Sequence, residues 1–223
     1  MALGTLIVAS LRLKSLKQDI QAGEKYYRNL QQSAGAMKET GINFDVVDVI
    51  NSDTIAWLYS PETPIDYPVV TAPEYGWYFN HLPDQTENTN GTLFLDANNL
   101  PDFTSKLNII YGKKMSTGGM LGSLVEYKEQ AYYNEHPVLY LYTKNGNYKI
   151  SLKYGCAVKA GEWRERAFQY EVNLDTLFQY AQVKTTFSSN VEIAEDSSIM
   201  VLSAGQSNFD DERYIVIGTL EEI

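Results

Sequence analysis

The stretch "VLSAGQSNFDDERYIVIGTL", residues 201–220, decides the fold of this chain. It overlaps two runs rich in β-branched and other apolar residues, "IMVLSA" at 199–204 and "RYIVIG" at 213–218, with a polar segment between them. Runs of this kind, separated by turn-forming residues, are typical of neighbouring β-strands. The stretch therefore predicts the last two strands of a β-rich body, with Gly205 after the first strand and Arg213 at the start of the second.

Further runs of the same kind precede this stretch. They lie at 65–70, 92–96, 108–112, 138–143 and 148–160, and the segment "INSDTIAWLYS" at 50–60 leads into the first of them. Asn145-Gly146 stands between two runs and is a strong signal for a two-residue hairpin turn. The spacing of the runs favours a closed or nearly closed barrel over an array of alternating strands and helices.

Two segments have helical periodicity instead. Apolar residues recur at near-helical spacing from Leu11 to Glu39, which predicts one or two helices packed on the outside of the body, and Gly41 ends the pattern. A second helical run covers about 174–184. We therefore divide the chain into an N-terminal helical appendage, residues 1–45, and a barrel domain, residues 46–223.

The apolar segment at residues 2–13 is too short to span a membrane, since a spanning helix needs about 20 apolar residues. Arg12 and Lys14 also interrupt it. Two interpretations remain open: the segment is the trimmed end of a membrane anchor, or it is the first part of an amphipathic helix.

Composition excludes some classes of function. The 223-residue chain has a net charge of -10 and a pI near 4.7, and no cluster of Lys and Arg, so we expect no nucleic-acid partner. The single cysteine, Cys156, cannot form an intramolecular disulfide. The oxygen-rich segments "DANN" at 96–99 and "NFDDE" at 208–212 lack the spacing of a calcium loop. We expect no metal and no cofactor.

Four segments, in the same order along the chain, resemble the class B sortases, transpeptidases that attach surface proteins to the cell wall of Gram-positive bacteria. They are "IDYPVV" (65–70), "YGWYFNHLPDQTENTNGTLFLDANN" (75–99), "NIIYGKKMSTGGMLGSLVEY" (108–127) and "LSAGQSNFDDERYIVIGTL" (202–220). The resemblance implies a mostly β fold, a closed sortase-type barrel of seven to eight strands. It also implies N-terminal helices and a helix between the sixth and seventh strands of the family.

The resemblance further implies where the family's chemistry would lie. Sortases use a cysteine nucleophile, a histidine that exchanges protons and an arginine that stabilises the oxyanion or holds the peptide. Arg213 matches the arginine, but Lys113 stands at the histidine position and Gly205 at the cysteine position. The peptide-binding groove would be formed by Lys113, Ser203, Ala204, Gly205 and Arg213. We call Lys113, Gly205 and Arg213 the substituted centre.

Other residues could in principle replace the missing groups. Lys113, if burial lowered its pKa, could serve as a base for Ser203 or Ser207. Cys156 has the alternating position of a core strand residue, and free cysteines are usually buried. His81 and His136 fall at positions that look non-catalytic in the family. These patterns favour a structural role for Cys156 and both histidines.

The sequence therefore favours a class B sortase-like protein without cysteine transpeptidase activity. It would recognise sorting-signal-like peptides, or act in surface-protein or pilus assembly, at the cell surface and held by a membrane anchor. Gly205 would widen the groove floor, and Lys113 and Arg213 would together hold a carboxylate. The alternative is an active peptidase or transpeptidase that uses Ser203 or Ser207 with Lys113. The oligomeric state is left open.

Overall fold

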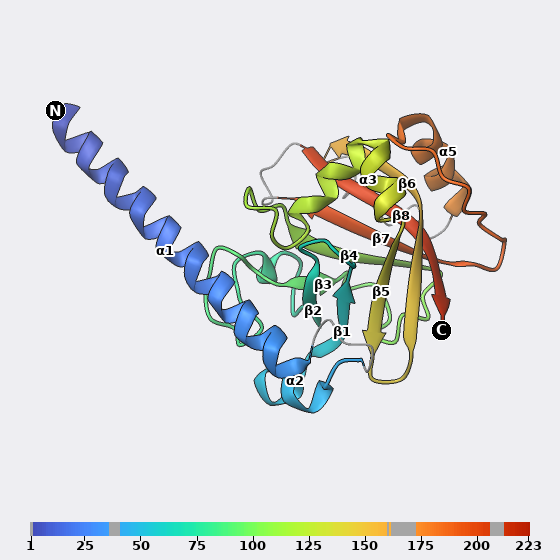
Figure 1. Ribbon diagram of the computed structural model, residues 1–223, viewed down its shortest axis with the longest axis horizontal. Coiled ribbons are helices and arrows are strands. Elements are labelled where there is room, and N and C mark those ends of the chain that lie inside the picture. The colour runs from blue at the N-terminus through green and yellow to red at the C-terminus, as the bar shows by residue number, and fades with distance from the viewer. Residues whose placement is uncertain (1, 36–40, 160, 162–172, 206–211) are drawn as a thin grey trace.

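The computed structural model describes residues 2–35, 41–159, 161, 173–205 and 212–223. Within these residues eight strands close into a barrel in the order β1-β2-β3-β4-β7-β8-β6-β5 (Figure 1). The strands are β1 Thr54–Tyr59, β2 Asp66–Thr71, β3 Leu93–Leu95, β4 Leu107–Lys113, β5 Val138–Thr143, β6 Asn147–Lys159, β7 Ser198–Gly205 and β8 Glu212–Glu222. The predicted closed barrel is confirmed.

The sheet is mixed, and its closure depends on a strand that the sequence patterns did not single out. The segment 50–60, expected only to lead into the first strand, contains β1, which pairs antiparallel with both β2 and β5. The pairs β2/β3 and β4/β7 are parallel. The hairpin at Asn145-Gly146 is present, but its connection covers residues 144–146, and Thr143 Oγ1 accepts from both backbone N–H groups of that dipeptide.

Alternation along β7 divides the apolar residues between two clusters, because successive strand side chains point to opposite faces. Met200, Leu202 and Ala204 belong to a large cluster that includes Trp57. Ile199 and Val201 belong to a second cluster, which α5 (Leu174–Lys184) covers with Leu177 and Ala181. The helix expected at about 174–184 is therefore present, between β6 and β7.

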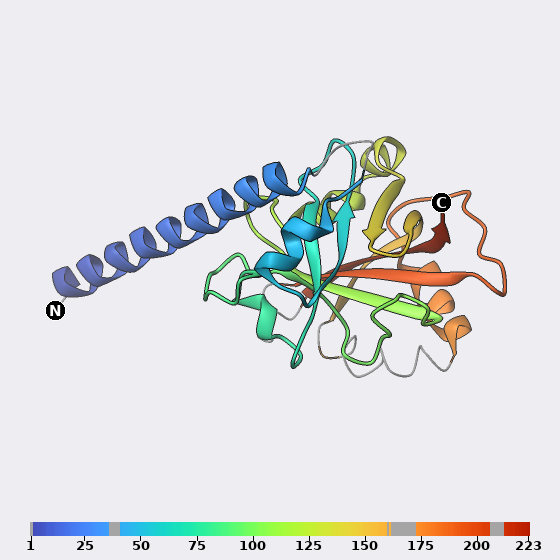
Figure 2. The ribbon, with the colours of Figure 1, turned by 90° about the horizontal axis from the view of Figure 1, so that it is seen from below.

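The first helix differs from its prediction. Helix α1 runs from Ala2 to Ala34 and thus begins earlier than the Leu11 expected from periodicity. Its C-terminal half packs on the barrel through Tyr27, Leu30 and Ala34, whereas its N-terminal half projects away from the body (Figures 1 and 2). Leu6, Ile7, Leu11 and Leu13 are exposed there. The end of the predicted range, 36–40, lies outside the described residues.

Short helices complete the described part of the chain. Helix α2 (Phe44–Ile50) was not predicted, although Asn43 caps it by accepting from the Asp45 N–H. The other short elements are η1 Trp77–Phe79, η2 Gly122–Lys128 and α3 Gln130–Glu135. None of the helices that the structure describes is both long and apolar enough to cross a membrane.

Candidate functional site

The ends of three strands bring the substituted centre together. Lys113, the last residue of β4, is the Cα partner of Gly205, the last residue of β7, and the Lys114 N–H donates to the Gly205 carbonyl oxygen at 2.7 Å. Strand β8 pairs with β7 through Ala204 and Tyr214, which sets Arg213 beside Gly205. Residues 113, 205 and 213, far apart in sequence, are therefore neighbours at one end of the barrel.

The space beside Gly205 is filled by Arg213. A Cβ atom built on Gly205 would lie 2.8 Å from Cζ of Arg213 and closer still to Nη1. Such distances are far inside van der Waals contact, so the guanidinium occupies the volume that a side chain at position 205 would need. The expectation that Gly205 widens the groove floor was wrong, because the arginine takes up the room that the glycine leaves.

Arg213 is buried, and few of its N–H groups have hydrogen-bond partners among the described residues. Arg213 is only 2% exposed, and its Nη2 donates to the Tyr75 hydroxyl at 3.2 Å. The guanidinium carbon lies 5.6 Å from the centroid of the Phe79 ring, a cation–π arrangement. Among the described residues, neither Nε nor Nη1 has a hydrogen-bond partner. Unsatisfied buried donors of a charged group are costly, so a ligand that accepts from them gains free energy.

Lys113 has a different environment from the one expected. Its ammonium donates to the carbonyl oxygens of Phe79 (3.1 Å) and Thr89 (2.6 Å) and to Asn80 Oδ1 (3.0 Å). Burial lowers the pKa of Lys113, and the negative charge of Asp19 partly opposes this effect. Three neutral oxygens already engage the three N–H groups, so Lys113 is not a free cation paired with Arg213 for a ligand.

The loop that binds Lys113 also binds α1. Asp19 of α1 accepts from the Thr89 N–H at 2.7 Å and from Asn88 Nδ2 at 2.9 Å. The Thr89 carbonyl oxygen in turn accepts from Lys113. Sequence reasoning missed this connection from α1 to the substituted centre. The Asn-rich segment "ENTNG" at 87–91 was its only signal, since such residues often bond to neighbouring backbone.

The predicted alternative nucleophile is poorly placed. Ser203 is fully buried, and its Oγ has no hydrogen-bond partner among the described residues, Lys113 included. A serine needs an adjacent base to react at neutral pH. Ala204, expected in the groove, is instead part of the large core cluster. Ser207 lies outside the described residues, as do Asp210 and Asp211.

Cys156 and the two histidines have structural environments. Cys156 is buried in β6, and desolvation raises the pKa of its thiol to about 12, which opposes thiolate formation. His81 stacks on Trp77 with ring centroids 4.0 Å apart, and His136 packs against Tyr132. Within the described part of the chain, no side-chain hydrogen bond or ring contact joins these three residues to the substituted centre. Within the described ranges, no group of three or more His, Cys, Asp or Glu residues could hold a metal ion.

The fold is a sortase-type barrel, as defined by the parallel β4/β7 pair, the strand order and the helix between β6 and β7. Comparison with known proteins supports this assignment. No family model matches the sequence. Sortase B of Listeria monocytogenes is 25% identical over 190 residues, which cover 81% of this chain and 77% of that protein.

Solved structures have the same fold. A Staphylococcus aureus sortase B–substrate complex has a TM-score of 0.75 at 19% identity, with 91% of this chain and 94% of that chain covered. A Streptococcus pyogenes class B sortase involved in pilus biogenesis has a TM-score of 0.70 at 26% identity, with 80% and 98% covered. The chain therefore resembles the class B sortases in both sequence and fold.

Proposed function

We propose that this protein is a non-catalytic member of the class B sortase family. It recognises a sorting-signal-like peptide, or a partner in surface-protein or pilus assembly, without cysteine transpeptidation. The observation that carries the proposal is the packing of Arg213 against Gly205: the guanidinium fills the volume of a side chain at position 205, and its Nε and Nη1 have no partners among the described residues. Loss of a nucleophile lowers the rate by several orders of magnitude where catalytic residues act as a unit.

The orphan N–H groups of Arg213 give the proposed recognition its chemistry. A peptide carbonyl or carboxylate oxygen that reaches Arg213 would accept charge-assisted hydrogen bonds, which are among the strongest in proteins. Tyr75 and Phe79 lie against the guanidinium and would flank such a ligand. Lys113 supports this site from the side by holding the carbonyl oxygens of Phe79 and Thr89. The likeness to a sortase solved with its substrate supports a peptide as the ligand.

The proposed location is the cell surface, outside the cytoplasm. The exposed apolar residues in the N-terminal half of α1, such as Leu6 and Leu11, would belong to the end of a membrane anchor. The likeness to a sortase involved in pilus biogenesis supports a role in the assembly of surface proteins. Fractionation of cells that express the natural protein tests the location, and recovery from the cytoplasm would contradict it.

Binding of a labelled sorting-signal peptide to single variants tests the proposed recognition. We expect Arg213→Ala to abolish binding, because it removes the orphan donors, and Lys113→Ala to weaken binding through its loop. Lys25→Ala, an exposed lysine of α1, serves as the control and should bind as the unmodified protein does. If neither Arg213→Ala nor Lys113→Ala reduces binding, the peptide does not use this site. Cleavage that disappears in both Ser203→Ala and Lys113→Ala would favour the serine peptidase alternative.

A further inference from the structure

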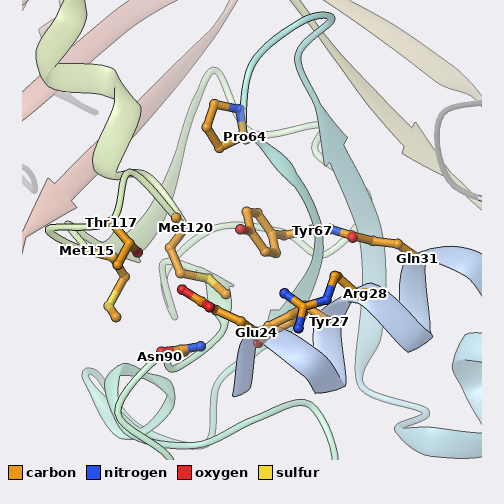
Figure 3. A pocket seen from close by; sticks show the side chains of 11 residues that line it. Glu24, Tyr27, Arg28, Gln31, Pro64, Tyr67, Asn90, Met115, Thr117 and Met120 are labelled. Carbon is orange, nitrogen blue, oxygen red and sulfur yellow. The ribbon is translucent and has the colours of Figure 1, made fainter. Parts of the chain in front are cut away.

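A second candidate site lies between α1 and the barrel. A cavity of about 200 Å³ separates α1 from the β2 strand and from the loop that follows β4 (Figure 3). None of the three residues of the substituted centre lines this cavity. Its volume equals about six or seven water molecules at their liquid volume, enough for one small organic molecule.

The cavity presents both a negative and a positive side chain from one helix. Glu24 and Arg28, one helical turn apart on α1, both line it (Figure 3). Among the described residues, neither side chain has a hydrogen bond or lies within ion-pair distance of an opposite charge. Glu24 is half-buried and Arg28 is exposed, so Glu24 is the less solvated of the two charged residues.

A buried acceptor without a partner lies in the same wall. Asn90 is only 3% exposed, and its Nδ2 donates to the Ile20 carbonyl oxygen. Its Oδ1 is buried and has no hydrogen-bond partner among the described residues. An unsatisfied buried acceptor is costly, so a donor on a ligand is favoured there. Asn90 and Glu24 together offer acceptors suited to an ammonium group.

The remaining wall is uncharged and largely apolar. Met115 and Met120 line it with Tyr67, and methionine side chains adapt to ligands of irregular shape. Burial raises the pKa of Tyr67, and the charges of Asp66 and Glu24 add to that effect. The tyrosine therefore stays uncharged, and its ring extends the apolar surface.

We propose that this cavity binds a small zwitterion of the amino-acid type with an apolar side chain. Its ammonium group would bind Glu24 and Asn90 Oδ1, its carboxylate would bind Arg28, and its side chain would pack on Met115, Met120 and Tyr67. The proposal is independent of peptide binding at Arg213, because the two sites share no lining residue.

Calorimetric titration of the full chain with L-leucine tests the proposal, with leucinamide and N-acetyl-leucine as probes that lack one charge each. L-Leucine should bind, and each derivative should bind at least about tenfold more weakly, as expected for loss of a charge-assisted hydrogen bond. Glu24→Gln and Arg28→Gln should each weaken L-leucine binding by a similar factor. Lys25→Gln, a nearby exposed residue of α1, should leave it unchanged.

Two results would overturn the proposal. Leucinamide that binds as tightly as L-leucine, with no effect of Arg28→Gln, would mean a plain ammonium site. Absence of binding for L-leucine, L-methionine and L-phenylalanine at about 10 mM would mean that the cavity takes no such ligand. Glu24 and Arg28 are not buried, so circular dichroism should show both variants folded and keep either result interpretable.

Discussion

Arg213 Nη1 lies where the side chain of residue 205 would begin, so Gly205 and Arg213 share one volume at the end of strands β7 and β8. A larger residue at position 205 would clash with the guanidinium in its present position. The absence of a side chain at position 205 and the burial of the arginine are therefore one packing arrangement.

Gly205→Ala should destabilise the protein by about 1–3 kcal/mol, because the added methyl group displaces the guanidinium from its packed position. The measurement is the free energy of unfolding in denaturant. In the double variant Gly205→Ala/Arg213→Ala the cost of the alanine at 205 should largely disappear, since residues in contact are energetically coupled.

Gly161→Ala is the control, since a Cβ at Gly161 would meet no atom of the described residues within 4 Å. Equal stabilities of Gly205→Ala and Gly161→Ala would contradict the packing of Arg213 against Gly205.

Lys113→Met should loosen the loop that the ammonium holds. The change leaves the Phe79 and Thr89 carbonyl oxygens and Asn80 Oδ1 without their donor, at a cost of about 2 kcal/mol. Amide hydrogen exchange should become faster across 79–90 in particular. Lys149→Met, a change to a strand lysine elsewhere, should leave that segment unaffected, and unchanged exchange in both variants would show that Lys113 does not hold the loop.

Asp19→Ala should weaken the attachment of α1 to the barrel. The carboxylate accepts from the Thr89 N–H and from Asn88 Nδ2, so its removal leaves the Thr89 N–H without this acceptor and Asn88 Nδ2 with only the Asp19 main-chain carbonyl oxygen, at a cost of about 1 kcal/mol. We expect faster hydrogen exchange in the C-terminal half of α1 and in residues 88–90. Asp196→Ala, at an exposed position away from α1, is the control. Equal exchange in the two variants would mean that packing of Tyr27 and Leu30 alone holds the helix.

Cys156 should be unreactive in the folded protein. Burial raises the pKa of its thiol to about 12, above its ordinary value, so the thiol stays protonated at pH 8 and thiolate appears only at strongly alkaline pH. A thiol-specific reagent at pH 8 should label the native protein far more slowly than the protein unfolded in guanidinium chloride. Labelling at equal rates would mean an accessible thiolate and would reopen a role for Cys156 in catalysis.

The barrel could largely be predicted from sequence because its strands have local signals. The runs at 199–204 and 213–218 are rich in β-branched residues, and the hairpin at Asn145-Gly146 was found by its turn residues. Strand β1 was missed because "TIAWLY" follows the polar Asn51-Ser52-Asp53 segment, which reads as a loop. Its position between β2 and β5 becomes evident only when the barrel closes.

The environment of the substituted centre could not be predicted, because it depends on contacts between distant residues. The aligned motifs predicted that Lys113, Gly205 and Arg213 lie close together. The strand register places them side by side. The partners of Lys113 come from a loop 24 or more residues away, and no local pattern shows which oxygens it meets. The rotamer that turns Arg213 toward Gly205 likewise depends on Tyr75 and Phe79.

Titration of the unmodified protein with a fluorescent sorting-signal peptide, with mass analysis of the end point, tests the central claim most directly. We predict saturable binding with the peptide mass unchanged, and loss of that binding in Arg213→Met, which keeps the bulk of the side chain without its N–H donors. Peptide cleaved by the unmodified protein, or binding that Arg213→Met leaves intact, would contradict a non-catalytic site built on Arg213.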